Sequence, residues 1–318
     1  MARSFVRIKA AAFSKMGTGG VTSLQNLGLR NEATLIIEDD PLIVDRNVPI
    51  RNFVKFSFEG ETVEIDYLKL KDFLEVYCVD GLVDAVFITA DQQAALDGRL
   101  LKGNEILRFG ASPNSNGYLG FGFRYTEEYS NGTKKTSCVM KGDLNLEKDE
   151  ADTILALALT NSSSEVIDPP NKARINPGII TAIESPTAST LVPKKDIHSY
   201  KLTLETKGDE AGLYGRTMPD YISVTLEIVV KDAGVMAMRT LMNANELPTV
   251  TIKEQISTTE FTHKTFAAKS IGRVVKNEVG NKRMMTINFQ GDIPVLGVTF
   301  ASDTVDTITT NTITFGVA

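Results

Sequence analysis

The stretch YLGFGFRYTEEYSNGTKKTSCVMKGDLNL, residues 118–146, decides the fold of this chain of 318 residues. Asn131-Gly132, near its centre, predicts a two-residue type I′ hairpin turn, since both central positions of that turn need a positive φ. A turn at this point places Tyr125 directly opposite Cys138 on the neighbouring strand. The segment therefore predicts a long antiparallel hairpin with a defined register.

The two faces of this hairpin differ in polarity. One face carries Phe123 opposite Met140, and the other carries Glu128 opposite Lys135. A slip of one residue would turn the charges toward the core, so the side-chain pattern and the turn predict the same register. The glycines of GYLGFGF, residues 117–123, lie on one strand face, where we expect them to let another surface approach closely.

A second stretch, FAAKSIGRVVKNEVGNKRMMTINFQGDIPV at residues 266–295, repeats this plan. A Gly-Asn turn at 280–281 can form there, with a turn at 279–280 as the alternative. The Gly-Asp pair at 291–292 ends the second strand, as the Gly-Asp pair at 142–143 does in the first hairpin. The turn at 280–281 pairs Glu278 with Arg283, Val274 with Ile287 and Gly272 with Phe289.

The elements before each hairpin also recur in the same order. TLIIE at 34–38 matches KLTLE at 201–205, and a polar loop with a proline follows each of them. A second strand comes next, NFVKFSFEG in the first half and YISVTLEIVV in the second, and then a helix. We predict a third strand after each helix, DAVFITA at 84–90 and TVTIKEQ at 249–255. The order strand, loop, strand, helix, strand, hairpin thus occurs twice.

Each predicted helix follows an aspartate that suits the N-cap position, Asp66 in the first half and Asp232 in the second. Side chains of one stripe then recur at helical spacing. The stripes consist of Tyr67, Leu70, Phe73, Leu74, Tyr77 and Cys78, and of Val235, Met238, Leu241, Met242 and Asn245. A further helix-like run, EADTILALAL at 150–159, has no counterpart in the second half.

These patterns predict a mainly β chain with one or two short helices per domain, and two similar β-sandwich or barrel domains in tandem. A linker rich in Pro, Ser and Asn separates them, and a tail with little to bury follows. The boundaries are an N-terminal arm at 1–33, a first domain at 34–160 with an insertion at about 91–117, a linker at 161–196, a second domain at 197–300 and a C-terminal tail at 301–318.

Composition narrows the classes of function. A formal net charge of −6 argues against an open basic face that wraps nucleic acid. Two cysteines are too few for a disulfide framework. No apolar run approaches the roughly 18 residues that span a bilayer, so we expect no membrane partner. Lys9 and Lys15 interrupt the apolar N-terminal stretch, and we therefore expect no signal peptide.

No group of residues in the sequence predicts catalysis, a cofactor or a metal. His198 and His263 have no cysteine or second histidine nearby in the sequence, whereas zinc needs clustered ligands. Cys78 and Cys138 fall on apolar faces and are expected in the core. MGTGGVTS at 16–23 lacks the lysine of a phosphate-binding loop. We therefore predict a protein without enzymatic activity or cofactor.

The duplicated order of strands, one helix and a long hairpin resembles the tube domain of long-tailed bacteriophages, which occurs in tail-tube proteins, baseplate hubs and related injection machines. The resemblance covers most of residues 34–159 and 201–300. In that family, single-domain subunits form six-membered rings whose sheets join edge to edge into an inner barrel. Two tube-type domains in tandem imply a ring of three subunits with pseudo-sixfold symmetry, and the rings stack into a tube.

The resemblance implies a structural virion protein of the tail, assembled in the host cytoplasm. Its implied partners are further copies of itself, other tail proteins such as the tape measure, the baseplate and a sheath where one exists, and double-stranded DNA that passes through without specific binding. The residues implied to line the lumen are Arg124, Glu127, Glu128, Lys135, Glu278 and Arg283, with an outward-facing position on the ring as the alternative. The residues implied in ring stacking are Asp39, Asp40, Asp45 and Arg46 in the loop 39–52, and Asp209, Glu210 and Arg216 in the loop 206–220.

Three alternatives stay open at the level of sequence. A baseplate hub or tube-terminator protein has the same fold. A double-barrel capsid protein also forms trimers with a pseudo-sixfold outline, but a jelly-roll domain needs eight strands and each half here gives five or six. A hydrolase on a β scaffold would use paired carboxylates such as Asp39-Asp40, whose separation in space the sequence does not give.

Overall fold

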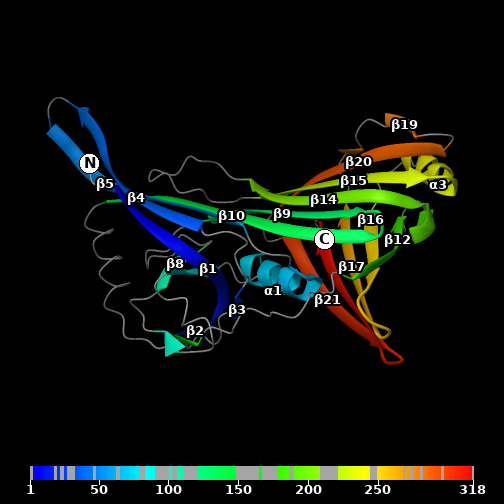
Figure 1. Ribbon diagram of the computed structural model, residues 1–318, viewed down its shortest axis with the longest axis horizontal. Helices are drawn as coiled ribbons and strands as arrows, with labels where there is room; N and C mark the ends of the chain where they lie inside the picture. The colour runs from blue at the N-terminus through cyan, green and yellow to red at the C-terminus, as the bar shows by residue number, and fades with distance from the viewer. Residues whose placement is uncertain are drawn as a thin grey trace.

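A computed structural model shows a protein that is mainly β, with two α-helices and two main sheets among the residues that it describes (Figure 1). This confirms the predicted fold class at that level. The structure describes residues 3–17, 20–21, 25–26, 33–45, 48–61, 65–78, 83–89, 100–101, 106–110, 121–147, 165–166, 178–185, 190–207, 221–243, 249–267, 270–271, 275–279, 282–294 and 297–316.

The larger sheet has 14 strands, and its main path runs β18-β20-β15-β14-β9-β10-β5-β4-β1-β6-β8, with β19 on β20 and β2 and β3 on β1. The strands from the first half of the chain are β1 (Arg3–Gly17), β2 (Gly20–Val21), β3 (Gln25–Asn26), β4 (Ala33–Asp45), β5 (Val48–Glu61), β6 (Val83–Thr89), β8 (Ile106–Gly110), β9 (Phe121–Ser130) and β10 (Thr133–Glu147). The strands from the second half are β14 (Ile197–Lys207), β15 (Tyr221–Lys231), β18 (Ser270–Ile271), β19 (Val275–Val279) and β20 (Lys282–Pro294).

The smaller sheet has six strands in the order β13-β12-β16-β17-β22-β21. Its strands run across those of the larger sheet on the right of Figure 1, and apolar side chains of both sheets fill the space between them. The members are β12 (Ile179–Ser185), β13 (Thr190–Pro193), β16 (Thr249–Gln255), β17 (Glu260–Ala267), β21 (Val298–Val305) and β22 (Ile308–Phe315). A separate two-stranded pair consists of β7 (Leu100–Leu101) and β11 (Glu165–Val166).

The first predicted hairpin is confirmed as the pair β9–β10. Asn131 and Gly132 form its turn with φ of 52° and 80°, as a type I′ turn requires. Tyr125 pairs with Cys138 and Glu128 with Lys135, as the side-chain pattern predicts. Both the predicted turn and the predicted register of this hairpin are therefore confirmed.

The second hairpin, β19–β20, follows the prediction over part of its length. Glu278 pairs with Arg283, in the register that a turn at 280–281 requires. Ile271 of the short strand β18, and not Gly272, pairs with Phe289, so that part of the prediction is wrong. The physical reason is a change of register by one residue between β18 and β19, which a simple alternating pattern does not contain.

Two helices follow β5 and β15, as predicted. Helix α1 (Tyr67–Cys78) begins after Asp66, whose Oδ1 accepts a hydrogen bond of 2.8 Å from the backbone N–H of Lys69. Helix α3 (Ala233–Met242) follows Asp232, but the Asp232 side chain makes no capping hydrogen bond. Thr136 of β10 fixes the entry to α1, because its hydroxyl accepts a hydrogen bond from the N–H of Ile65 and donates one to the carbonyl of Ile65.

The same strand-pairing order occurs in both halves of the chain. The first half contains the order β4-β5-β10-β9 and the second half the order β14-β15-β20-β19, with antiparallel pairing throughout. The strand after each helix also pairs in the same way, because β6 lies between β1 and β8 as β16 lies between β12 and β17. Antiparallel pairing of β9 with β14 joins the two series.

A β-bulge recurs at the matching place in both series. The pairing of β1 with β6 shifts between Ile8 and Ala10, and the pairing of β12 with β16 shifts between Ile180 and Ala182. A bulge adds one residue to one strand and bends it, so its position is a specific feature of a sheet. The agreement between the two halves therefore extends from element order to local irregularity.

Three segments that the sequence pattern left outside the domains form strands. The predicted N-terminal arm contains β1, β2 and β3, and the predicted linker contains β12, β13 and the 3₁₀ turn Lys194–Asp196. The predicted tail is the hairpin β21–β22, with Ile313 and Phe315 buried. The sequence pattern did not reveal these strands because their partners lie far away in the chain, as β1 pairs with β6 and β12 with β16.

The segment expected as a loop at 39–52 belongs to a long hairpin of β4 and β5. Asp39 pairs with Val54, Asp40 with Phe53 and Asp45 with Val48. Figure 1 shows this hairpin extending beyond the rest of the large sheet. Within the insertion expected at about 91–117, β8 pairs with β6. The helix-like run 150–159 lies outside the described residues.

Candidate functional site: the outer sheet face and the charge cluster beneath it

The side of the large sheet that faces away from the core is polar across five strands, β10, β9, β14, β15 and β20. We call this side the outer face. Pairing aligns its residues in rows across the strands. One row contains only hydroxyl and amide side chains: Ser137, Thr126, Thr203, Thr225 and Gln290. This composition suits a surface in contact with water.

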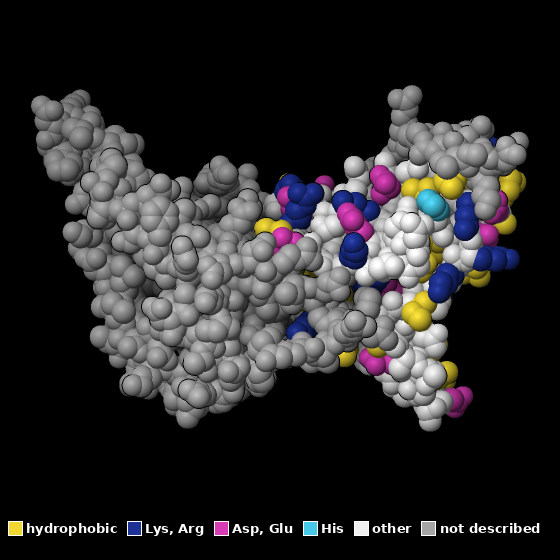
Figure 2. Space-filling model, in the orientation of Figure 1, with side chains coloured by type: hydrophobic (Ala, Val, Ile, Leu, Met, Phe, Trp, Pro, Cys, Tyr) yellow, Lys and Arg dark blue, Asp and Glu magenta, His cyan; other side chains and the backbone are white. Residues whose placement is uncertain are grey.

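A neighbouring row of the outer face alternates in charge. It runs Lys135, Glu128, Lys201, Glu227 and Asn288 through four successive strand pairings. Lys201 and Glu128 form an ion pair across the β9–β14 junction, and their side chains are 48% and 52% exposed. Lys207 and Glu205 form a second pair nearby. Figure 2 shows basic and acidic side chains distributed together over the described surface in that view.

The structure separates the residues that the sequence grouped as lumen-lining. Arg124, Glu128 and Lys135 are exposed on the outer face. Glu127 lies on the opposite face of β9 and is fully buried, so its assignment to the same surface as Glu128 is wrong. The physical reason is strand alternation, since neighbouring residues of a strand point to opposite faces. Glu278 and Arg283 are paired in β19–β20, and their side chains lie outside the described part of the protein.

Glu127 belongs to a buried cluster of two carboxylates and two ammonium groups. Glu127 and Lys134 come from β9 and β10, whereas Glu254 and Lys264 come from β16 and β17. The Lys264 Nζ lies 2.7 Å from Glu127 Oε2 and 3.0 Å from Glu254 Oε2. The Lys134 Nζ lies 2.8 Å from Glu254 Oε1 and 3.5 Å from Glu127 Oε2. Each carboxylate therefore faces both ammonium groups.

Two tyrosines complete the hydrogen bonding of this cluster. The Tyr125 hydroxyl donates to Glu127 Oε2 at 2.7 Å. The Tyr200 hydroxyl lies 2.6 Å from Glu127 Oε1 and 3.0 Å from Glu254 Oε1. The Tyr200 ring also stacks on Tyr129, with ring centroids 5.6 Å apart. These contacts satisfy the carboxylate oxygens, as buried charges require.

The cluster holds its members in their charged forms. Burial alone would raise the pKa of Glu127, but the Lys134 and Lys264 ammonium groups outweigh it and hold that pKa well below its usual range. Burial alone would lower the pKa of Lys264, but Glu127 and Glu254 outweigh it and raise that pKa above its usual range. Burial raises the pKa values of the Tyr125 and Tyr200 hydroxyls, and the neighbouring carboxylates raise them further.

These geometric features assign the cluster a structural role. The carboxylates are 0% exposed and fully paired, so a substrate has no access to them. Opposite charges at short distance specify one arrangement of the groups that carry them. The cluster therefore fixes the β9–β10 hairpin of the first half against β14, β16 and β17 of the second half.

Sequence reasoning missed this cluster, although a signal was present. Glu127 alternates with Tyr125 and Tyr129 on the inward side of β9, and Lys264 stands between Thr262 and Phe266 on β17. Inward positions that hold charges in otherwise apolar strands indicate buried ion pairs when both signs occur. The partner of Glu127, Lys264, lies 137 residues away in the sequence. The pattern within one strand does not identify so distant a partner.

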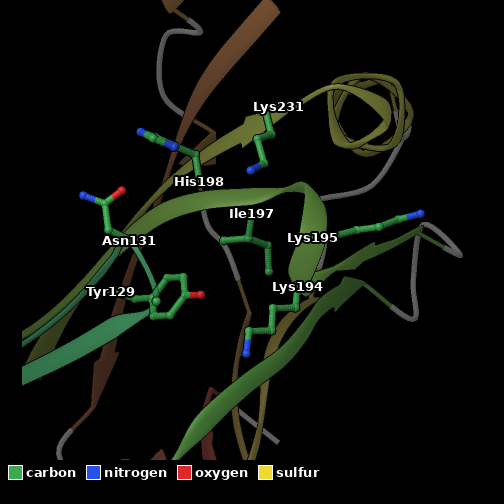
Figure 3. A pocket seen from close by; sticks show the side chains of 8 residues that line it. Tyr129, Asn131, Lys194, Lys195, Ile197, His198 and Lys231 are labelled. Carbon is green, nitrogen blue, oxygen red and sulfur yellow. The ribbon is translucent and has the colours of Figure 1, made fainter. Parts of the chain in front are cut away.

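A basic pocket of about 510 Å³ lies beside the turn of the first hairpin. Its lining residues are Tyr129, Asn131, Gly132, Lys194, Lys195, Ile197, His198 and Lys231. In Figure 3, the Lys195 side chain extends away from the pocket and Lys194 and His198 point to different sides. The positive groups therefore do not converge on one point, as recognition of a single anion would require.

The residues predicted for ring stacking lie in two regions. Asp45 is in β4 at the end of the long β4–β5 hairpin, where it pairs with Val48. Asp39 and Asp40 lie in the middle of β4, and their β5 partners Val54 and Phe53 still pair with β10. Arg46, Asp209, Glu210 and Arg216 lie outside the described residues.

The described side chains include no group of three or more His, Cys, Asp and Glu residues arranged to hold a metal ion. No helix in the described part of the chain is long and apolar enough to cross a membrane. Neither the known protein-family models nor the curated protein sequences match this chain.

Proposed function

We propose that this protein is a structural subunit of a phage-type tail tube, in which three chains form a pseudo-hexameric ring and the rings stack into a channel for DNA. The pairing of β9 with β14 is the observation that carries the proposal. It joins the two strand series within one chain edge to edge. The same joint, formed between chains, closes a ring without exposed sheet edges.

The repeated pairing order supports a tandem duplication of one tube-type domain. Each half contributes four strands in the same order to the large sheet, and each contains the same bulge beside the strand that follows its helix. Two unrelated β domains have no physical reason to share such a local irregularity. A trio of duplicated chains then presents six equivalent units.

The outer face has the chemistry that a DNA-conducting wall needs. Its charges alternate in sign along a row of paired strands, as in Lys135, Glu128 and Lys201. DNA binds tightly where clustered lysines and arginines release its counterions. Each positive group here has a carboxylate beside it, so DNA gains little by contact and can slide. The proposal therefore assigns the outer face to the lumen.

The long β4–β5 hairpin is the proposed contact between rings. It extends beyond the other strands of the sheet in Figure 1, and Asp45 of β4 pairs with Val48 at its end. An element that projects along a strand direction can reach the next ring of a stack. A head-to-tail contact of this kind continues from ring to ring and produces a tube.

The large sheet, to which both halves contribute strands, favours the tail tube over a double-barrel capsid protein. A double-barrel capsid protein has two separate sandwiches, whereas here a continuous ladder crosses from β9 to β14. A baseplate hub or tube terminator forms the same ring but does not stack into long tubes. Partners in this proposal are further copies of the chain, other tail proteins and DNA in transit, and the site of action is the virion tail.

Electron microscopy of the purified protein in negative stain tests the proposal. The expected particles are rings with a central hole, and stacks of such rings at higher protein concentration. Closed shells or solid trimers would support the capsid alternative instead. Rings that never stack would point to a hub or terminator, and single chains at every concentration would overturn the proposal.

A further inference from the structure

The two halves of the chain can be aligned residue by residue through their strand pairing. In the first half, Gly142 pairs with Phe58, and Phe58 pairs with Leu35. In the second half, Gly291 pairs with Val224, and Val224 pairs with Leu204. The Gly-Asp pairs that begin at Gly142 and Gly291 occupy matching positions in the two hairpins. Leu35 of β4 therefore corresponds to Leu204 of β14, and the sequence match of TLIIE with KLTLE, which aligns Leu35 with Leu202, is wrong by two residues.

These matching positions have different neighbours on their other side. Leu204 pairs with Tyr125 of β9, which belongs to the other half of the chain. Leu35 pairs with Val6 of β1, the N-terminal strand. Both pairings are antiparallel, and both use the edge of the strand that faces away from its hairpin partner. The segment Arg3–Ile8 thus occupies on β4 the place that β9 occupies on β14.

In the second half, the strand order β14-β15-β20-β19 ends at β19, which lies at the edge of the large sheet. β19 corresponds to β9, because Val275 pairs with Thr286 as Thr126 pairs with Ser137, at the same distance from the turn. β9 has partners on both sides, whereas β19 pairs only with β20 in the described part of the chain. Its free backbone groups form a template for a further strand.

We propose that β19 of one chain pairs with β4 of a second copy, and that the N-terminal segment Arg3–Ile8 holds the β4 edge until that copy displaces it. This inference rests on the proposed ring. It adds which strands join neighbouring chains and which segment must leave before they can join. The internal junction predicts the register. Thr126 pairs with Thr203, which corresponds to Thr34, so Val275 is expected opposite Thr34 of the next copy.

Pairing of the N-terminal segment with β4 protects the single chain before assembly. An open strand edge pairs with any other edge that it meets, which leads to disordered aggregates. A segment of the chain's own N-terminus satisfies the hydrogen-bonding groups of residues 33–38 in the single chain. In the predicted register, Val275 and Lys276 of β19 lie opposite Thr34 and Ala33, which pair with Arg7 and Ile8 in the single chain. The entering strand exchanges the hydrogen bonds at these two positions for equivalent ones, and the ring gains through the side chains that become buried.

Two cysteine pairs that share Thr34→Cys test this inference. In the first variant, Val275→Cys with Thr34→Cys, oxidation of assembled protein is expected to link neighbouring chains into covalent trimers. The control combines Val275→Cys with Leu35→Cys, which shifts one partner to the opposite face of β4 and should not cross-link. Rings that form normally but give no cross-link in the first variant would overturn the assigned joint.

The second variant, Arg7→Cys with Thr34→Cys, locks the N-terminal segment in place, because these two residues are directly paired. The oxidised protein is expected to remain a single chain, and reduction is expected to restore assembly of the same sample. Normal rings from the oxidised protein would overturn the role of the segment. A wild-type chain that forms no rings would instead contradict the proposed function itself, so the two failures can be told apart.

Discussion

The two long hairpins of this chain share a plan and differ in what their outer strands contact. β9 of the first hairpin pairs with both β10 and β14, and its inward side carries Glu127 in a buried charge cluster. In the second hairpin, the inward side of β20 carries Ile287 and Phe289, and β19 pairs only with β20 among the described residues. The same hairpin design thus forms a junction between the two halves at β9 and, among the described residues, a strand edge at β19.

The largest expected effect comes from breaking the charge cluster at the finished junction. Glu127→Ala leaves the buried ammonium groups of Lys134 and Lys264 short of a partner. Removal of one member of a buried ion pair costs about 3–5 kcal/mol. We expect the free energy of unfolding, measured by chemical denaturation, to fall by this amount.

The neighbouring residue Glu128 provides the matched control, since it has the same side chain on the opposite face of β9. Glu128→Ala removes an exposed pair with Lys201 and is expected to change the unfolding free energy by at most about 1 kcal/mol. Equal effects of the two substitutions would show that the cluster does not stabilise the junction.

The same cluster predicts acid sensitivity. The pKa of Glu127 in the folded chain is held below the unfolded value of about 4.3. Its ionised form therefore contributes stability above about pH 4.3, and this contribution is lost as the pH falls below that value. Unfolding free energies measured from pH 6 downward should decrease, and Glu127→Gln should make the decrease smaller. A pH dependence unchanged by Glu127→Gln would contradict this assignment.

An intermediate effect is expected at Gly122, where the β9 backbone contacts Thr206 of β14. A Cβ atom added at Gly122 would lie 2.8 Å from the Thr206 hydroxyl oxygen, which hydrogen bonds to the backbone of Phe123. Gly122→Ala should therefore destabilise the protein by about 1–3 kcal/mol through local strain. Adding Thr206→Ala should recover part of this loss in a double-mutant cycle. Purely additive effects would show that the contact does not cause the strain.

The smallest expected effect concerns the outer face. The exposed pair Lys201 and Glu128 should show a coupling energy below about 1 kcal/mol in a double-mutant cycle. The coupling should decrease further at high salt, since exposed charges are screened. A coupling several times larger would mean that this face is desolvated, and an open channel wall would then be excluded.

The sequence predicts the structure correctly where residues close together in the chain determine it. The Asn131-Gly132 turn and the alternation of Phe123 and Tyr125 with polar residues were enough to give the register of β9–β10. Asp66 and the apolar stripe that follows it gave α1. These features depend on neighbours within a few residues, and local stereochemistry dictates them.

Sequence reasoning failed where distant segments decide the outcome. Nothing within β12 or β22 indicates that each is an inner strand of the smaller sheet, because β12 pairs with β16 and β22 with β17, and both partners are distant in the sequence. The pairing of Glu127 with Lys264 depends on the β9–β14 junction, which brings the two halves together. The β9–β14 junction forms only in the tertiary structure. The outer face and the buried charge cluster lie on its two sides, so neither could be predicted before that pairing was known.

The mass of the ring tests the central claim most directly. Native mass spectrometry of assembled protein counts the chains, each of 34.7 kDa. The account predicts three chains per ring, in a particle whose outline in averaged images has six similar lobes, because each chain supplies two of them. A ring of six chains, or three lobes from three chains, would show that the two halves do not act as equivalent units and would contradict the account.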